Sequence, residues 1–241
     1  MKPYYEDGLK PDLTQFTVRE IPKEQTYEWL LKKHYARRIP QIQYAFGLYD
    51  GSNILTGVCT FGLPPNQNLA LMCGDEYKDN LLELNRLVLS NNERNIASYF
   101  ITKCFKLLPL PKIIVSYSDP NNGHHGYIYQ VLNGIYTGYG GEAKEYIFQN
   151  KRYNSRHIKN YWFESRGVTF NADKTIDEQF MAIGGIVKEV EPKHRYVFFL
   201  GSKRQKKDML ANLKYDVLPY PKGDNQKYDA SYEPPKQGVL V

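Results

Sequence analysis

Apolar and polar residues in the first part of the chain follow patterns typical of a helix and then a β-hairpin. Residues 14–33 predict an entry segment followed by a helix in the stretch KEQTYEWLLKKHY. Residues 44–62 contain two β-rich runs on either side of Asp50-Gly51-Ser52-Asn53. This spacing predicts a hairpin whose turn relies on Gly51 for its positive φ angle.

The rest of the chain predicts alternating strands and helices. Apolar runs predict strands at 81–89, 112–116, 135–141 and 195–200, and amphipathic or polar segments predict helices at 95–108, 124–132 and 202–213. This alternation favours an α/β (α+β) fold, with a mixed central β-sheet flanked by helices. We expect one domain over residues 14–221, a basic aromatic insertion at 142–192 and a flexible C-terminal tail at 222–241.

Composition places the chain among ordinary globular proteins, with 41% apolar and 24% charged residues. No run of eighteen apolar residues occurs, and the N-terminus lacks the apolar core of a signal peptide. The three cysteines, Cys59, Cys73 and Cys104, have no metal-ligand spacing. We therefore expect a cytoplasmic protein with buried thiols and no contact with a membrane.

The net charge of +6 is concentrated in two segments. Residues 144–166 hold six basic residues against two acidic ones, and residues 193–214 hold seven against one. Aromatic residues alternate with the cations of the first segment, as in Arg152, Tyr153 and Arg156. Cations beside stacking platforms are typical of nucleic-acid binding. A solvated basic face, on strands that pack their aromatic residues inward, is an equally good interpretation.

Several motifs together resemble known families. The strand ELNRLVL, the Ser/Asn loop and the helix after it resemble the core of GCN5-related N-acetyltransferases. The chain resembles the Mom family of phage DNA-modification proteins more closely, from residue 29 to residue 221. The matching pieces are His34-Tyr35, the hairpin GLYDGSNILTGVCTFG, the stretches LLELNRLVLSNNERNIAS and SYSDPNNGHHGYIYQVLNGIYTG, and the strand RYVFFL with its basic helix.

The resemblance implies an enzyme that converts the N6 amine of adenine in phage DNA into a carbamoylmethylated form, which protects that DNA from host restriction. It also implies double-stranded DNA with a flipped adenine as the partner, and a homodimer. Two other functions stay open. One is an N-acetyltransferase acting on a small molecule or a protein, and the other is a DNA-binding module without catalysis.

The acetyltransferase resemblance implies acetyl-coenzyme A as a cofactor. The residues that would contact it are Val88, Leu89, Asn95, Ala97 and Ser98. The loop at 90–98 contains no glycine, however, so we do not expect coenzyme A to bind in the usual manner. Asn95 or Ser98 can equally be the N-cap of the following helix. The product implied for the family carries an alkyl carbon on N6, so simple acyl transfer is not the expected reaction.

Five polar residues are candidates for catalysis. They are Asp119, Arg86, His34, Tyr35 and Ser116. Asp119 would accept a hydrogen bond or a proton from N6, although an Asp before Pro is also typical of a turn. An arginine on an apolar strand needs an anion, so we expect Arg86 to pair with Glu83, with Asp119 or with a substrate. Ser116 can orient substrate or simply end its strand.

Two further groups of residues have less specific signals. His34, Asp119 and Glu83 are candidate ligands for iron or another divalent metal, and a His-Tyr pair lining an adenine pocket is the alternative. Candidate DNA contacts outside the aromatic segment are His124, His125, Tyr129, Lys203, Arg204, Lys206 and Lys207. We expect His125 and Tyr129 on one face of a helix that begins at His124.

Overall fold

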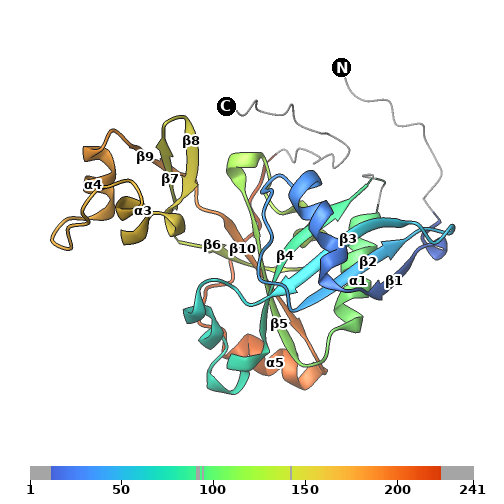
Figure 1. The fold of residues 1–241 in the computed structure, drawn as a ribbon. Helices are drawn as coiled ribbons and strands as arrows, with labels where there is room; N and C mark the ends of the chain where they lie inside the picture. The colour runs from blue at the N-terminus through green and yellow to red at the C-terminus, as the bar shows by residue number, and fades with distance from the viewer. Residues whose placement is uncertain (1–11, 91–92, 94, 142, 224–241) are drawn as a thin grey trace.

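The computed structural model describes residues 12–90, 93, 95–141 and 143–223, so almost all of the predicted tail lies outside the described residues. A seven-stranded sheet forms the centre of the molecule in the order β1-β2-β3-β4-β5-β10-β6 (Figure 1). Its strands are β1 Thr17–Glu20, β2 Tyr44–Tyr49, β3 Leu55–Gly62, β4 Leu81–Leu89, β5 Lys112–Ser118, β6 Ile135–Tyr139 and β10 His194–Leu200. This mixed sheet, covered by helices, confirms the predicted fold class.

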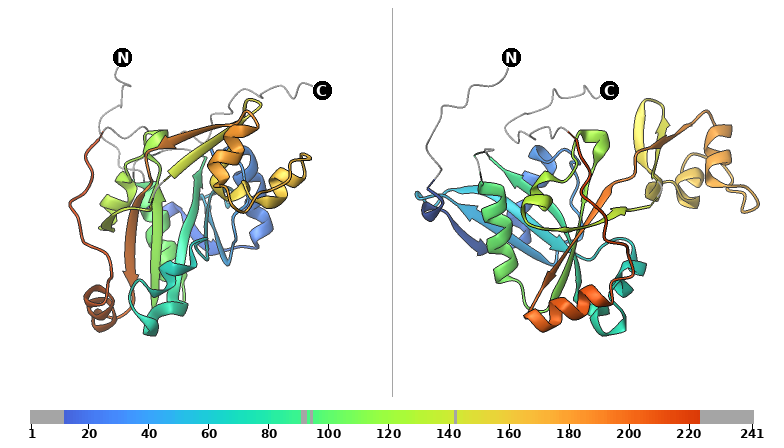
Figure 2. Two further views of the ribbon diagram at one scale, coloured as in Figure 1. Left: turned by 90° about the vertical axis from the view of Figure 1, so that its left-hand side faces the viewer. Right: turned by 180° about the vertical axis from the view of Figure 1, so that it is seen from behind.

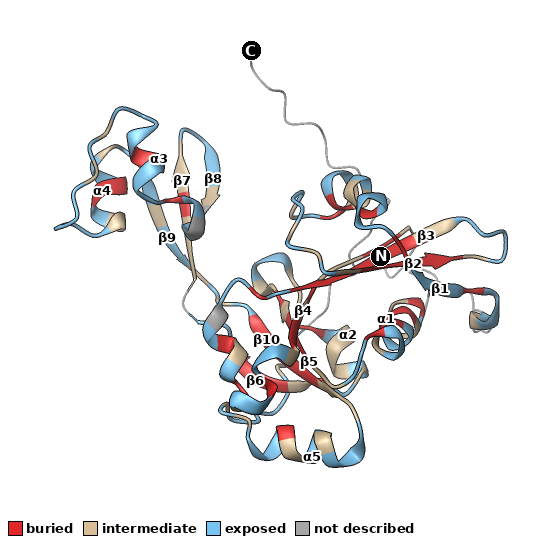
Figure 3. Cartoon of the chain, turned by 60° about the horizontal axis from the view of Figure 1, so that its bottom comes forward, coloured by how far each residue is buried: buried red, intermediate tan, exposed pale blue. Residues whose placement is uncertain are grey.

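Each face of the sheet packs against its own set of helices. The alternation of side chains along β5 places Ile114 in one core and Ile113 and Val115 in the other. The helices α1 Ile96–Leu107 and α2 Tyr127–Val131 pack against the first core, and α5 Lys203–Ala211 packs against the second. Figure 3 shows buried residues concentrated on the central strands, while the outer faces of α1 and α5 are exposed.

Strands β4 and β5 form the parallel pair of the sheet, and they separate early. Only residues 81–83 of β4 pair with residues 113–115 of β5, although β4 continues to Leu89 and β5 to Ser118. The buried Ser116 hydroxyl donates a hydrogen bond of 3.0 Å to the Leu84 carbonyl, just beyond the last paired residues. The two strands then diverge, and an opening forms between their carboxyl ends.

Short helices cover the remaining edges of the molecule. The predicted first helix consists of a 3₁₀ segment, η2 Lys23–Thr26, and a π-helical turn, η3 Trp29–Lys33. The other short helices are η1 Leu13–Gln15, η4 Gln67–Leu71, η5 Asp75–Asn80, η6 Pro120–Asn122 and η7 Ser155–His157. The predicted helical segment is therefore present, but it is not a regular α-helix.

The hairpin of β2 and β3 is present, but the predicted role of Gly51 in its turn is wrong. Asn53 has the positive φ of 62°, and Gly51 does not. Asp50 organises the turn, because its carboxylate accepts hydrogen bonds of 2.9 Å from the backbone N–H groups of Ser52 and Ile54. Asparagine tolerates the left-handed region better than most residues, which explains the exchange of roles.

The predicted insertion forms a second unit with its own sheet, in the order β8-β7-β9. Its elements are β7 Ala143–Phe148, β8 Lys151–Asn154, β9 Ile186–Val190, α3 Asn160–Glu164 and α4 Ile176–Ala182. Figure 1 and the rear view in Figure 2 show this unit, here called the inserted subdomain, projecting from one side of the central sheet. Tyr146, Trp162 and Phe163 are buried in its core, as the inward-packing interpretation of the aromatic segment predicts.

Two glycines with similar positive φ angles provide a test of the packing around α2. Gly126 (φ 81°) precedes α2, and an added Cβ would lie 2.3 Å from the buried Tyr196 ring. Gly184 (φ 86°) has no described atom within 4 Å of such a Cβ. We expect Gly184→Ala to lower the free energy of unfolding by about 1–2 kcal/mol, from backbone strain alone. Gly126→Ala should cost roughly 1–3 kcal/mol more, because its methyl group overpacks the core. Urea unfolding of both variants measures the difference, and equal losses would contradict the packing described here.

Candidate active site

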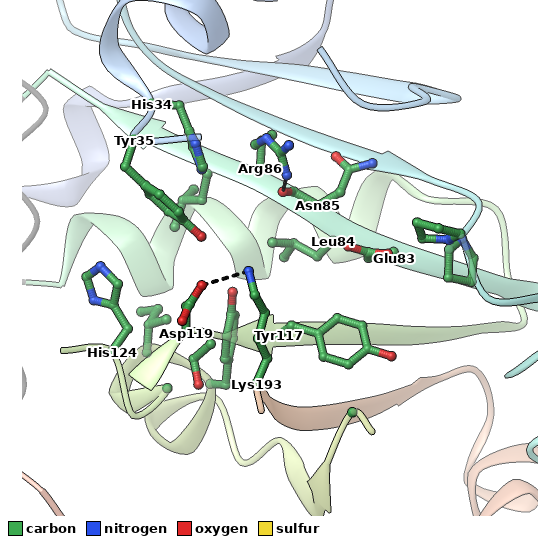
Figure 4. Close-up of a pocket in the computed structure, with 18 of the residues that line it drawn as sticks. His34, Tyr35, Glu83, Leu84, Asn85, Arg86, Tyr117, Asp119, His124 and Lys193 are labelled. Carbon is green, nitrogen blue, oxygen red and sulfur yellow. Dashed lines mark hydrogen bonds and ion pairs between the residues drawn. The ribbon is translucent and has the colours of Figure 1, made fainter. Parts of the chain in front are cut away.

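The opening between β4 and β5 leads into a cleft of about 510 Å³. Its walls come from the segment after η3, from β4, from the loop between β5 and α2, and from α2 itself. The base of the inserted subdomain also contributes Gly140, Gly141, Ala143, Lys144 and Ser155. Figure 4 shows Tyr35 and His124 at one end of this cleft and Glu83 and Tyr117 at the other.

Many of the sequence-predicted residues meet in this cleft although they are far apart in the chain. The predicted residues that line it are His34, Tyr35, Glu83, Arg86, Leu89, Ala97, Asp119, His124 and Tyr129. Ser116 does not line it: its side chain is fully buried and bonded to Leu84. Ser116 therefore supports the strands below the cleft instead of facing a substrate.

Asp119 combines a structural role with a position in the cleft. One carboxylate oxygen accepts a hydrogen bond of 3.1 Å from the Asn121 backbone N–H, so Asp119 caps η6 as the turn interpretation predicts. The other oxygen forms an ion pair of 2.8 Å with Lys193. Burial alone would raise the pKa of Asp119, but hydrogen bonds and charge from Lys193 and Asn121 outweigh burial and lower it. Asp119 is therefore ionised at neutral pH.

Arg86 lies on β4 beside an irregularity in the β3–β4 pairing at Asn85. Its Nη1 donates to the Asn85 carbonyl, and its buried Nε has no hydrogen-bond partner among the described atoms. The predicted ion pair with Asp119 is wrong, because Asp119 pairs with Lys193. Within the described part of the chain, Arg86 forms no ion pair with Glu83 either. Burial, followed by the nearby charge of Arg38, lowers the pKa of Arg86.

His34 and Tyr35 form an aromatic wall of the cleft. Their rings are stacked with centroids 4.4 Å apart, and the Tyr35 ring lies 6.2 Å from that of His124. His34 is only 6% exposed, whereas Tyr35 is 44% exposed. Burial, and then the positive charges around it, of which Arg86 is the first, lower the pKa of His34 to about 3. His34 is therefore neutral at physiological pH.

The predicted ligands for iron or another divalent metal, His34, Asp119 and Glu83, are not gathered into one cluster in the described part of the chain. Among the described residues, no group of three or more His, Cys, Asp or Glu side chains is close enough to hold a metal ion. Nδ1 of His34 accepts a hydrogen bond of 3.0 Å from the Ala36 N–H, so the neutral ring carries its proton on Nε2. Asp119 is engaged by Lys193. The alternative, in which His34 and Tyr35 line a pocket, agrees with this geometry.

The candidate cofactor residues are only partly gathered at the cleft. Leu89 and Ala97 line it, whereas Val88 is 1% exposed and belongs to the core. Ser98 donates its hydroxyl to the Asn95 carbonyl, and Asn95 occupies the N-cap position of α1 without a side-chain bond to the helix. Residues 91, 92 and 94 of this loop lie outside the described residues. The described residues do not form the glycine-rich cradle that a coenzyme A pyrophosphate usually occupies.

The candidate DNA contacts within and around α2 do not all lie in the cleft. His124 and Tyr129 line the cleft. The predicted helix start is wrong, because α2 begins at Tyr127. His125 therefore does not share a helical face with Tyr129, and its ring lies 5.8 Å from that of His194, away from the cleft. Burial is the main cause that lowers the pKa of His124, although the charge of Asp119 opposes it.

The candidate DNA contacts of the basic segments lie farther away. Tyr153 packs against Trp162 with ring centroids 5.6 Å apart, and Arg152 pairs with Glu145 at 3.3 Å. The side chain of Arg156 lies outside the described residues. The cations Lys203, Arg204, Lys206 and Lys207 lie on α5, which follows the end of β10 farthest from the inserted subdomain (Figure 1). That end is about 20 Å from the start of the strand.

Several residues of the cleft were not singled out from the sequence. They are Arg38, Asn85, Tyr117, Ser118, Tyr127 and Lys193. Lys193 is the most informative, because antiparallel pairing of β10 with β5 sets His194 opposite Ser118 and brings Lys193 to Asp119. Sequence reasoning counted Lys193 only as part of a basic segment. A correct strand pairing would have placed it beside Asp119.

The fold and the cleft together define an α/β protein with a candidate enzyme site where two parallel strands diverge. A model of the Mom protein family matches residues 15–222. The chain therefore belongs to the Mom protein family, as its motifs predict. Membership supports a role in the modification of adenine in phage DNA.

Solved structures similar to this chain include acetyltransferases of Vibrio cholerae. The spermidine/spermine N-acetyltransferase SpeG in complex with manganese ions matches with a TM-score of 0.42 and 11% identity over 78% of this chain and 94% of that chain. Mutant forms of SpeG match with the same TM-score and identity over 82% and 98% of the respective chains. No curated protein sequence matches the chain significantly. None of the helices in the described residues is long and apolar enough to cross a membrane.

The lowered pKa of His34 predicts a specific loss of stability in acid. The folded chain keeps His34 neutral down to about pH 3, whereas the unfolded chain takes up a proton near pH 6.5. The titration of His34 therefore does not affect the free energy of unfolding above pH 6.5. As the pH falls from 6.5 toward 3, protonation of the unfolded chain lowers this free energy by at most about 1.4 kcal/mol per pH unit. His34→Asn retains an acceptor for the Ala36 N–H but does not titrate. Urea unfolding at pH 7 and pH 5 should show wild type losing more stability than this variant, and parallel losses would contradict the prediction.

Proposed function

We propose that this protein modifies the N6 amine of adenine in DNA by a carbamoylmethylation-type transfer, with the β4–β5 cleft as its active site. The observation that carries the proposal is the position of Asp119, an ionised carboxylate, in a cleft that also holds an aromatic wall and Arg86. Membership of the Mom family supports the same assignment. By this proposal, the modification protects phage DNA from restriction.

The shape of the cleft suits a base that has left the duplex. A flipped base is held by stacking and by hydrogen bonds to its edge, which offsets the few kcal/mol that unstacking costs. Tyr35 and Tyr127 line the cleft and are 44% and 61% exposed. These rings, together with the neutral His34 and His124, form the wall on which we place the adenine.

The reaction requires help for a weak nucleophile. The N6 lone pair of adenine is delocalised into the ring, so the amine must be held against its electrophile. N6 forms a bond to the donor carbon, the donor releases its leaving group, and N6 loses a proton. The lowered pKa of Asp119 makes it a weak base in the free protein, so it acts first as a hydrogen-bond acceptor that orients N6. The N6 proton becomes acidic once the new bond places positive charge on N6, and the Asp119 carboxylate then accepts it.

Nucleoside mass spectrometry of plasmid DNA from cells expressing the protein tests this function. We expect wild type to yield a new deoxyadenosine species whose mass increment identifies the transferred group. Asp119→Asn should reduce its amount by about a hundredfold or more, because it removes the charge that accepts the proton. Asp50→Asn is the matched control, since Asp50 also caps a turn through its carboxylate but lies outside the cleft.

Unmodified DNA from soluble, folded wild-type protein would contradict the proposal. Turnover of acetyl-coenzyme A on an amine without DNA would instead favour the N-acetyltransferase. Equal modification by wild type and Asp119→Asn would remove Asp119 from the reaction and leave the function in place.

The proposal also assigns α5 to the DNA-holding surface, and this assignment has its own test. Binding through phosphates weakens with salt, and log K falls by about 0.9 per unit of log salt for each phosphate neutralised. Replacing Lys203, Arg204, Lys206 and Lys207 with Gln should flatten this slope. Binding to duplex DNA, measured by fluorescence anisotropy between low and moderate salt, gives the slope. An unchanged slope would restrict the DNA surface to the mouth of the cleft, about 20 Å from α5 along β10.

A further inference from the structure

Two buried polar atoms without described partners belong to residues on either side of the opening between β4 and β5. Arg86 Nε and Ser118 Oγ are buried and have no hydrogen-bond partner among the described atoms. Arg86 lies three residues beyond Glu83 on β4, and Ser118 lies three residues beyond Val115 on β5, where Glu83 and Val115 are the last paired residues. Both residues line the cleft. Buried polar groups are nearly always hydrogen-bonded, so two such atoms in one opening point to a missing ligand.

The charges of the cleft indicate the chemistry of this ligand. The described lining contains four basic side chains, Arg38, Arg86, Lys144 and Lys193, and two acidic ones, Glu83 and Asp119. Lys193 already neutralises Asp119. Arg38 and Arg86 repel each other, and neither forms an ion pair within the described part of the chain. The side chains of Arg38 and Arg86 therefore give their part of the cleft an excess of positive charge, which the single carboxylate of Glu83 does not balance.

We propose that Arg86, Ser118 and Arg38 form a subsite for an oxyanion, either a carboxylate or a phosphate. A guanidinium group and a hydroxyl group can both donate to the oxygens of such an anion. An adenine ring is a poorer acceptor for these two donor groups than an oxyanion, because it offers neutral ring nitrogens in place of charged oxygens. The inference deepens the proposed function, on which it rests for the nature of the substrates. The anion belongs either to the DNA phosphate beside the flipped adenine or to an acidic group on the donor.

Titration with inorganic phosphate at constant ionic strength, followed by ³¹P NMR, tests the subsite without requiring activity. Wild type should bind phosphate saturably. Arg86→Gln should weaken binding by about tenfold or more, because it removes a charged hydrogen bond. Ser118→Ala and Arg38→Gln should weaken it severalfold, and Arg38 is exposed, so its variant retains the fold.

The matched control is Arg19→Gln. Arg19 lies on β1, where its guanidinium packs 3.7 Å from the centre of the Tyr49 ring, outside the cleft. Its variant should bind phosphate as wild type does. Absence of saturable binding to wild type, or equal affinity in Arg86→Gln, Arg38→Gln and Arg19→Gln, would overturn the subsite.

A second titration in the presence of saturating adenine-containing DNA identifies the source of the anion. Loss of phosphate binding would assign the subsite to the DNA backbone, and retention would assign it to the donor. Nucleoside mass spectrometry on the same variants separates the two proposals. Modified DNA without phosphate binding would overturn the subsite alone, whereas phosphate binding without modified DNA would overturn only the proposed function.

Discussion

The early separation of β4 from β5 is the constraint on which the rest of the site depends. Parallel strands normally continue their ladder, but here pairing stops after residues 81–83 and 113–115. The Ser116 hydroxyl satisfies the Leu84 carbonyl where the backbone ladder has ended. The carboxyl ends of both strands can then diverge without leaving this carbonyl unbonded. Arg86 and Asp119, which the divergence carries apart, become opposite walls of a cleft.

Once the two strands have separated, the contacts between charged side chains determine the electrostatics of the cleft. Asp119 is held by Lys193, the residue before β10, and forms no ion pair with Arg86 on the other wall. The consequences are an ionised carboxylate on one side and an excess of positive charge on the other. His34 is buried among these charges and responds by remaining neutral. A single cleft thus offers a hydrogen-bond acceptor, a neutral aromatic wall and cations, which suit the amine, the ring and an anion respectively.

Local sequence patterns predicted the β2–β3 hairpin, the strands β4, β5, β6 and β10, the helices α1 and α5, and nine of the residues that line the cleft. These patterns did not predict contacts that depend on tertiary structure, such as which strands pair. Lys193 could not be placed beside Asp119 without knowing that β10 runs antiparallel to β5. The start of α2 was misjudged because Gly126 takes a left-handed conformation against Tyr196, which delays the helix past His125. Of the three partners expected for Arg86, Asp119 is paired with Lys193 instead, which sequence cannot show, and a substrate group stays a prediction.

The inserted subdomain connects the chemistry of the cleft to the recognition of a large substrate. Its aromatic residues stabilise its own core, so Tyr153 and Trp162 are not free platforms for bases. Its base instead supplies Ala143, Lys144 and Ser155 to the wall of the cleft. Lys144 pairs with Asp177 of α4, which ties this wall to the helices of the subdomain. The subdomain and the cleft thus share a wall, and under the proposed function a long substrate can contact both.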